Sequence, residues 1–309
     1  MPAAASHRRR LAIVGLGHVG GSVALAAKAR GQGEPGQTWG FDRDSDVRRR
    51  ALELGIVDRA PVSAVEAVAE AEVVVLACPV RAIPAAAREI APALGAGTLI
   101  VDVGSVKGAL VRQVRAVLPP EAKFVGCHPL AGTERAGPES ARADLFEGRR
   151  CLVCPDRDTP RAVVEEATAL WRALGASTSE LDPDRHDALL AATSHLPHVA
   201  AYALAAALAD AFDTGGVGAG QEAAAAELAS VVTTSLRDTT RIAASSPIMW
   251  RDILIENRAH VGPLLVRLAD AVAELRAAMD AGDADAIEAF LTRARDGRRR
   301  LVEDVGGPP

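Results

Sequence analysis

The first half of the chain alternates short apolar runs with stretches of helical character. The runs are almost continuously hydrophobic, which is typical of parallel strands that are covered on both faces. We expect strands at 11–17, 38–42, 72–79, 98–104, 123–129 and 150–155. We expect helices between them at 18–30, 44–54, 80–92 and 106–118. This alternation predicts a doubly wound parallel sheet, on which ligands bind beyond the carboxyl ends of the strands.

The pattern changes after about residue 181, where the chain becomes rich in Ala and Leu and loses every strand signal. Asp182 before Pro183 is a favourable helix start, because aspartate caps free N–H groups and proline is tolerated in the first turn. Helices continue over 221–244, 247–279 and 283–300, after a glycine-rich break at 215–221. We therefore expect an α/β domain over 1–181 and an all-helical domain over 182–309. The helices are apolar around much of their surface, which predicts a homodimer formed through the helical domain.

Composition narrows the classes of partner. The formal net charge is −5 and no basic face stands out, so we expect no nucleic acid partner. No run of about 18 apolar residues predicts a membrane span, and a glycine-rich turn interrupts the only apolar run near the N-terminus. We expect a cytoplasmic protein. Cys151-x-x-Cys154 has metal spacing, but no second such pair or nearby histidine completes a zinc set, so we expect no metal.

A glycine-rich segment follows the first expected strand and opens the first expected helix. It consists of Gly15, Leu16, Gly17, His18, Val19 and Gly20. Its three glycines allow a tight turn, close approach of a pyrophosphate and close packing of helix on strand. Asp42 ends the next strand, and its carboxylate suits the ribose hydroxyls of NAD. Arg43 beside it could accept a 2′-phosphate, so NADP is the second candidate. The segment predicts a Rossmann-type domain that binds NAD.

Two further strand ends carry candidate chemistry. Ser105 follows the strand at 98–104, where its hydroxyl could cap the next helix, face the crevice, or do both. His128 ends the strand at 123–129, within the segment HPLAGTERAG that also contains Glu134. A histidine there could be structural. At the carboxyl edge of the sheet, a neutral imidazole could also take a proton from an alcohol as hydride leaves.

The helical half supplies two more polar segments. His195 and His198 lie three residues apart in SHLPH, where Pro197 is expected to kink the helix. No carboxylate signature accompanies them, which disfavours a metal site. Arg241 lies in RDTTRIAASSPIMW and could pair with Asp238 on the helix surface. Oriented in that way, its guanidinium would also suit a substrate carboxylate.

Six motifs together resemble those of the prephenate/arogenate dehydrogenase family. GLGHVGGS, ACPV, DVGSVK, HPLAGTERAG, SHLPH and RDTTRIAASSPIMW occur in the family's order, and the resemblance covers about residues 10–300. It implies a Rossmann domain followed by a helical dimerisation domain. It also implies NAD(P)-dependent oxidative decarboxylation of prephenate to 4-hydroxyphenylpyruvate in tyrosine biosynthesis, or of arogenate to tyrosine, or of both substrates.

The resemblance also implies a role for individual side chains. His128 matches the catalytic histidine, and Ser105 matches the serine that orients it and approaches the nicotinamide. Arg241 matches the arginine that binds a substrate carboxylate. Residues matched to the walls or gate of the substrate pocket are Glu134, His198 and Trp250. We also expect His195 at the substrate, and Pro79 and Val80 at the cofactor. Leu130 and Ser246 depart from the residues that are frequent at their positions.

From the length of the chain we expect neither a regulatory ACT domain after the helical domain nor a chorismate mutase domain before the nucleotide-binding domain. Inhibition by tyrosine would therefore act at the active site. Two other readings stay open. One is another dehydrogenase with a helical dimer domain, such as a β-hydroxyacid dehydrogenase, although all lysines here precede residue 124 and exclude a lysine catalyst in the helical half. The other is a non-catalytic protein that senses NAD.

Overall fold

The computed structural model describes residues 9–132, 135–213 and 231–303 of the chain. The expected glycine-rich break at 215–221 lies outside these ranges, as does part of the helix expected over 221–244. The chain forms two compact units, Met1–Arg258 and Ala259–Pro309. Each unit is described by itself.

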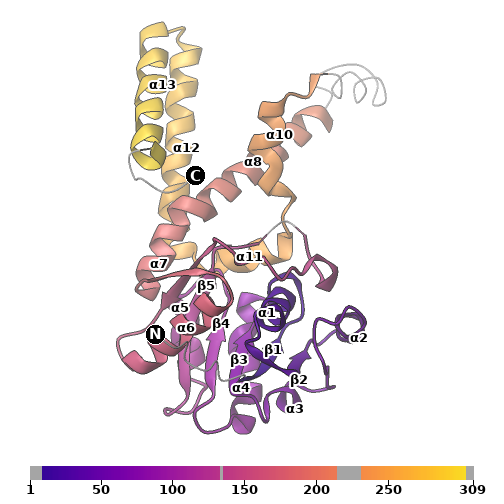
Figure 1. The fold of residues 1–309 in the computed structure, drawn as a ribbon. Coiled ribbons are helices and arrows are strands. Elements are labelled where there is room, and N and C mark those ends of the chain that lie inside the picture. Colours follow the sequence, from indigo (N-terminus) through magenta and orange to yellow (C-terminus); the bar gives the residue numbers. More distant parts are fainter. Residues whose placement is uncertain (1–8, 133–134, 214–230, 304–309) are drawn as a thin grey trace. The chain divides into compact units, whose positions relative to one another are not determined.

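The first unit is built on a seven-stranded sheet with the order β2-β1-β3-β4-β5-β6-β7 (Figure 1). Strands β1 to β5 run parallel, as the hydrophobic runs predict. The strands are β1 (Arg9–Val14), β2 (Gly33–Phe41), β3 (Val73–Leu76), β4 (Leu99–Asp102), β5 (Lys123–Pro129), β6 (Arg150–Cys154) and β7 (Ser177–Glu180).

The last two strands differ from the expected pattern. β6 runs antiparallel to β5, with Pro129 opposite Cys151, so β6 begins beside the end of β5. The connection therefore stays at the carboxyl edge of the sheet and needs no crossover helix, and its described part contains the short turn η3 (Pro138–Ser140). β7 was not expected at all, because its sequence STSE has no apolar residue and it forms an exposed edge paired with β6.

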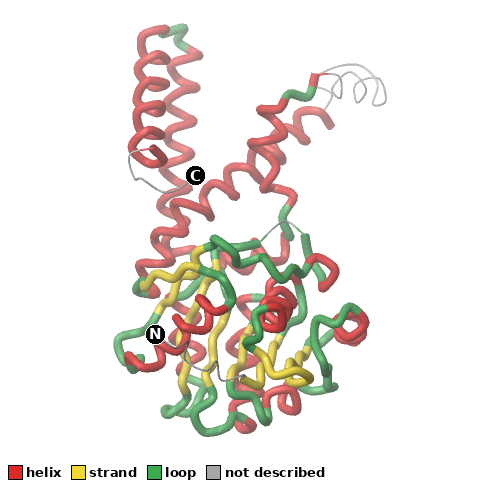
Figure 2. Tube along the Cα trace, viewed as in Figure 1, coloured by secondary structure: helices red, strands yellow, loops and turns green. Residues whose placement is uncertain are grey.

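Figure 2 shows the helices of the first unit in red around the yellow strands of its sheet. They are α1 (His18–Ala29), α2 (Ser45–Glu53), α3 (Ala64–Val68), η1 (Val80–Ala82), α4 (Ile83–Ile90), η2 (Ala91–Ala93), α5 (Gly108–Arg115), α6 (Arg161–Ala173), α7 (Pro183–Leu190), η4 (Ala191–His195), α8 (Leu196–Asp213), α10 (Thr234–Thr240), η5 (Arg241–Ala244) and α11 (Pro247–Glu256).

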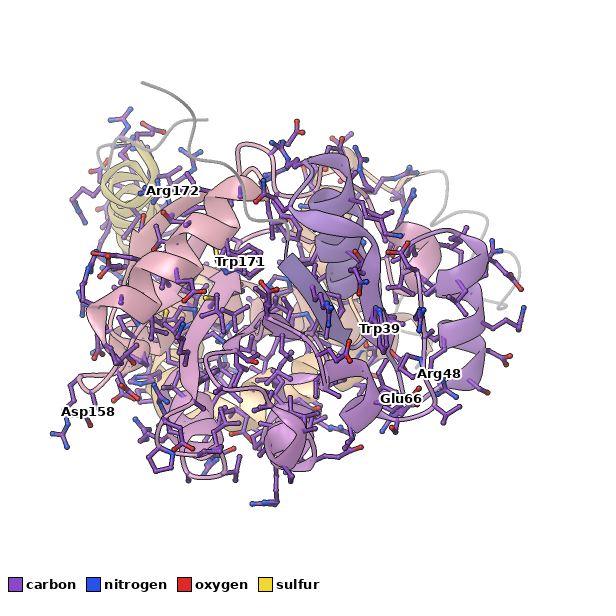
Figure 3. All side chains as sticks on the ribbon, turned by 60° about the horizontal axis from the view of Figure 1, so that its bottom comes forward. Trp39, Arg48, Glu66, Asp158, Trp171 and Arg172 are labelled. Carbon is purple, nitrogen blue, oxygen red and sulfur yellow. The ribbon has the colours of Figure 1, made fainter. Side chains whose placement is uncertain are left out.

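Alternate residues of β1, β3, β4 and β5 enter two separate cores, one on each face of the sheet. Leu11 and Ile13 of β1 face α1 and α6, whereas Ala12 and Val14 face α3, α4 and α5. On α6, Trp171 is fully buried while the next residue, Arg172, is exposed (Figure 3). Trp250 and Ile253 of α11 join the second core. That helix therefore packs with the sheet, although it lies in the half of the sequence that was expected to form a separate domain.

The entry into the helical half follows the expected capping chemistry. The Asp182 carboxylate accepts a hydrogen bond of 2.9 Å from the backbone N–H of Arg185, and Pro183 is the first residue of α7. Before Pro197 the helix widens into the π-helical turn η4. Proline has no N–H for the helical ladder, and this turn is the distortion expected at SHLPH.

The second unit contains α12 (Arg258–Asp280, from its second residue), α13 (Ala284–Arg298) and the turn η6 (Arg299–Glu303). An ion pair of 2.8 Å between Arg293 and Glu274 joins the two long helices. Large apolar side chains remain exposed in this unit, including Val266, Val272 and Met279. Among the helices of the described ranges, none is long and apolar enough to cross a membrane.

Candidate active site

The glycine-rich turn lies at the carboxyl end of β1, and its glycines have different constraints. Gly15 has φ +105°, and a Cβ there would lie 2.6 Å from the backbone of Ala77. A Cβ on Gly20 would lie 1.9 Å from the carbonyl oxygen of Gly15. A Cβ on Gly17 would meet no atom within 4 Å. Gly15 and Gly20 are thus required by the fold, whereas Gly17 faces open space that a bound ligand could use.

The start of α1 fits a negatively charged group. No side chain caps this helix end and its first turn has no acidic residue, so the helix dipole and free N–H groups are uncompensated. The backbone N–H of Leu16 donates 2.9 Å to the Asp42 carboxylate at the end of β2, while the next residue, Arg43, is exposed. These features fit the pyrophosphate and ribose of a dinucleotide.

The other residues predicted at the cofactor lie around this turn. His18 is buried, and its Nδ1 lies 2.8 Å from the carbonyl oxygen of Ser140, so the imidazole joins α1 to the turn η3. Val19 is half-buried. Pro79 is exposed directly after β3, and Val80 is buried in the core beneath it.

His128 lies at the carboxyl end of β5, where the sequence predicts it. Its ring is half-buried, and its Nδ1 lies 2.8 Å from Nε2 of His186 on α7. Nδ1 of His186 in turn lies 2.8 Å from Oδ1 of Asp187. Burial lowers the pKa of His128 well below the ordinary value, and the positive charge of Lys107 acts in the same direction. His128 is therefore a neutral imidazole near pH 7.

The Asp187 carboxylate caps the start of α5. It accepts 2.7 Å from the backbone N–H of Lys107 and 2.8 Å from that of Gly108. The expectation that Ser105 caps this helix is therefore wrong, because the helix begins three residues after Ser105 and its free N–H groups are taken by a carboxylate from α7. Ser105 is half-buried in the segment between β4 and α5.

A fully buried ion pair supports the same region of the sheet edge. The Lys107 ammonium donates to the Asp102 carboxylate at the end of β4, and both side chains are inaccessible. Asp102 also accepts from the backbone N–H groups of Gly104 and Cys127, at 2.8 Å and 3.1 Å. This carboxylate thus ties the end of β4 to the end of β5, directly before His128.

A second branch leads from Asp187 to the histidines of the SHLPH segment. Nδ2 of Asn257 donates 2.8 Å to the carbonyl oxygen of Asp187 and lies 2.9 Å from Nδ1 of His195. The His195 ring meets the Trp250 indole edge-on, with centroids 5.8 Å apart. Trp250 stacks on His198 at 3.8 Å. Contacts between neighbours therefore connect His128 with both histidines of SHLPH.

Both of these histidines favour the neutral form. Burial lowers the pKa of His195 to about 4. Burial also lowers the pKa of His198, and the positive charge of Arg241 lowers it further. The guanidinium is therefore close enough to His198 for its charge to be felt, and it belongs to the same compact unit as His128.

Arg241 differs from its expected setting in one respect. Within the described ranges it forms no ion pair with Asp238; α10 ends at Thr240 and Arg241 begins the turn η5, where its side chain is exposed. The alternative in which Arg241 pairs with Asp238 on one helix surface is therefore not observed in the described residues. Glu134, the remaining residue predicted in the pocket, lies outside the described residues.

Three residues at the centre of this network were missed in the sequence: His186, Asp187 and Asn257. A polar His-Asp pair on an otherwise apolar helix face, in DPDRHDALL, is the signal that could have drawn attention to the first two. Nothing near Asn257 marks it out, because its partners are 62 and 70 residues away along the chain.

The cysteines of β6 lie in the core. Cys151 and Cys154 are buried, and burial raises the pKa of both thiols. Neither therefore forms a thiolate near neutral pH. Across the described ranges, no group of three or more His, Cys, Asp or Glu side chains is arranged to hold a metal ion.

The sheet, the glycine turn at the end of β1 and the helical second half define an α/β nucleotide-binding protein with a helical C-terminal part. Family models extend this result. Residues 23–180 match the nucleotide-binding domain of prephenate dehydrogenase, and residues 182–293 match its dimerization domain. The chain belongs to the prephenate dehydrogenase family and is an oxidoreductase with a site for an NAD-type cofactor.

Individual relatives match nearly the whole chain. A cyclohexadienyl dehydrogenase of Zymomonas mobilis is 34% identical over 96% of this chain and 97% of its own length. A prephenate dehydrogenase of Bacillus subtilis is 31% identical over 94% of this chain and 75% of its own. The crystal structure of prephenate dehydrogenase from Aquifex aeolicus, in complex with hydroxyphenyl propionate and NAD+, is 27% identical, with a TM-score of 0.78 over 96% of this chain and 100% of that one.

Proposed function

We propose that this protein catalyses the NAD-dependent oxidative decarboxylation of prephenate to 4-hydroxyphenylpyruvate, a step of tyrosine biosynthesis. The observation that carries the proposal is the neutral His128 at the carboxyl end of β5, in the same compact unit as the glycine turn at the end of β1. In a doubly wound sheet, ligands bind at this edge. Oxidation of an alcohol requires a proton acceptor and a hydride acceptor. His128 would be the first, and the glycine turn would hold a dinucleotide that is the second.

The reaction follows from the chemistry of prephenate, which carries a hydroxyl on ring carbon C4 and a carboxylate on C1. The glycine turn and Asp42 would hold NAD, which would supply the acceptor for the hydride from C4. Nε2 of His128 accepts the hydroxyl proton, and a C4 carbonyl forms. The C1–carboxylate bond then breaks, carbon dioxide leaves, and its electron pair enters the ring. The ring becomes aromatic, and the phenolate oxygen regains a proton from His128.

Positioning is the main task left to the protein, since aromatisation makes the overall step favourable. Arg241 is exposed and has no ion pair with Asp238, so its guanidinium is available for a substrate carboxylate. His195, His198 and Trp250 form the adjoining wall. Glu134 belongs to the same proposed pocket, and Ser105 orients His128.

NAD is the proposed cofactor because Asp42 directly follows β2 and lies next to the glycine turn, where its charge would repel a 2′-phosphate. We also propose a nucleotide-binding domain over 1–181 and a helical domain over 182–309. A homodimer formed through the helical domain would cover the exposed Val266, Val272 and Met279. Tyrosine, which resembles the product, would inhibit by occupying the pocket.

Arogenate is the second candidate substrate, alone or together with prephenate, and the similarity to a cyclohexadienyl dehydrogenase favours it. The test is the rate of reduced nicotinamide formation by the full chain with prephenate, arogenate and a 3-hydroxy acid, each with NAD and NADP. We expect the highest kcat/KM for prephenate with NAD. A higher value for arogenate would transfer the proposal to the second candidate, and turnover of the 3-hydroxy acid alone would contradict both.

A further inference from the structure

His128 is bonded to a second histidine that the proposed chemistry does not use. The bonds from His128 Nδ1 to His186 and from His186 to Asp187 are each 2.8 Å long. The His186 side chain is fully inaccessible and that of Asp187 is 6% exposed. Water therefore cannot substitute for any partner, and each nitrogen must be a donor or an acceptor according to its neighbour.

The Asp187 carboxylate, at the end of this row of hydrogen bonds, determines which atom donates in each bond. Burial acts to raise the pKa of Asp187, but the hydrogen bonds from His186, Lys107 and Gly108 outweigh it, and the pKa is lowered. An ionised carboxylate can only accept, so Nδ1 of His186 must carry a hydrogen. Burial lowers the pKa of His186, which is therefore neutral, and its Nε2 has a free lone pair.

Nε2 of His186 can then only accept, so Nδ1 of His128 must donate to it. A neutral His128 that carries its hydrogen on Nδ1 has its lone pair on Nε2. We propose that His186 and Asp187 are positioning residues that hold His128 in this tautomer, the one in which Nε2 can take the hydroxyl proton of a substrate. A free histidine side chain favours the opposite tautomer, so the protein must impose this one.

The backbone of Asp187 imposes the complementary state on His195. Its carbonyl oxygen accepts from Asn257 at 2.8 Å, which requires the amide nitrogen, since a flipped amide would place two oxygens together. The same nitrogen lies 2.9 Å from Nδ1 of His195 and donates to it. His195, held neutral, therefore carries its hydrogen on Nε2. One residue thus makes His128 an acceptor for a hydroxyl and His195 a donor to an oxygen such as a carbonyl or carboxylate.

The tautomers can be measured without substrate, although the proposal rests on the proposed function for its catalytic meaning. Nitrogen NMR of the full chain labelled with ¹⁵N-histidine distinguishes ring nitrogens that carry hydrogen from those that do not. The spectrum of His128→Asn identifies the His128 signals. We expect a hydrogen on Nδ1 of His128 and none on Nε2 near neutral pH. The opposite tautomer, or a doubly protonated ring, would overturn the proposal even if prephenate were turned over.

Two substitutions of His186 test the positioning role. His186→Leu removes the acceptor, and His186→Gln places an amide oxygen and nitrogen at nearly the spacing of the two ring nitrogens. We expect kcat to fall about 100-fold for leucine and less than about tenfold for glutamine, with the KM for prephenate changed by less than about twofold. The His128 tautomer should change in the leucine variant and persist in the glutamine variant.

Asn257→Leu is the matched control, since it cuts only the branch to His195. It should change the His195 signals and leave the tautomer of His128 as it is. Equal losses of kcat in the two His186 variants, or an unchanged His128 tautomer in His186→Leu, would remove His186 from the positioning role. If His186→Leu fails to fold, the spectra of the unmodified chain and of His186→Gln still decide the question. Failure of every enzyme preparation to oxidise prephenate, with the expected tautomers present, would instead contradict the proposed function alone.

Discussion

The imidazole of His198 stacks on the indole of Trp250, with ring centroids 3.8 Å apart and planes inclined by 23°. The stack joins α8 to α11, and the Trp250 side chain, 5% exposed, continues into the core beneath the sheet. Trp250 therefore acts both as a wall of the proposed pocket and as a core residue. These two roles should separate when the size of its side chain is changed.

We predict that Trp250→Ala lowers the free energy of unfolding by about 3–5 kcal/mol, because it leaves a cavity in the core and removes the stack. Trp250→Phe should cost less than half of that and should keep an aromatic face on His198. Urea denaturation measures both effects. Equal stability of the two variants would show that Trp250 does not support the core.

The glycine turn gives a prediction with an internal control. At Gly17 a methyl group meets no protein atom within 4 Å, and φ −75° suits alanine. Gly17→Ala should therefore keep the stability of the fold but weaken NAD binding at least about tenfold, because the methyl group occupies the path of the pyrophosphate. At Gly20 the methyl group would collide with the backbone of Gly15, so Gly20→Ala should unfold at lower temperature. Calorimetric titration and thermal melts separate the two outcomes, and undiminished NAD binding by Gly17→Ala would place the cofactor elsewhere.

Cofactor preference should depend on Asp42 and the exposed Arg43. We predict that Asp42→Ser, which removes the negative charge, raises kcat/KM with NADP and lowers it with NAD, for a combined change of about tenfold or more. Arg43→Ala is the matched control and should lower activity with NADP only. If the ratio of kcat/KM with NADP to kcat/KM with NAD did not change in Asp42→Ser, the role of Asp42 would be limited to its hydrogen bonds with the backbone of Leu16 and Asp44.

We expect the protein to lose stability in mild acid, because the fold keeps buried histidines neutral. His195 titrates at about 4 in the folded chain because of burial, and near 6.5 when unfolded. Between these values the unfolded chain binds more protons than the folded chain. The contribution of neutral His195 to the free energy of unfolding is therefore complete above about pH 6.5 and is lost as the pH falls toward about 4. His195→Gln should reduce this loss by up to roughly 3 kcal/mol, as measured by urea denaturation at a series of pH values. Identical pH dependence in both proteins would show that His195 is not held neutral by the fold.

The sequence predicted the parts of this molecule whose signals are local. Continuous apolar runs indicated β1, β3, β4 and β5, and Asp182 with Pro183 indicated the start of α7. The polar edge strand β7 has no such signal. The direction of β6 depends on the path of the chain between β5 and β6, which has no local signal. The same division holds for the site.

His128 stood out because a strand end followed by HPLAGT is unusual in composition. Asp187 did not, because its role comes from bonds to residues about 80 positions away in α5. Local spacing allows a helix cap by Ser105 and a pair between Arg241 and Asp238, and the structure shows neither. In both cases longer-range packing determined the result, and packing of that kind cannot be derived from spacing alone.

In the proposed mechanism, neutral His128 accepts the hydroxyl proton during oxidation of prephenate. Steady-state turnover of His128→Asn, measured beside NAD binding by the same preparation, tests this role. Asparagine keeps a polar side chain of similar size but cannot accept a full proton. We expect kcat to fall about 10²–10⁴-fold and NAD affinity to change by less than about twofold. Turnover close to that of the unmodified chain would contradict it.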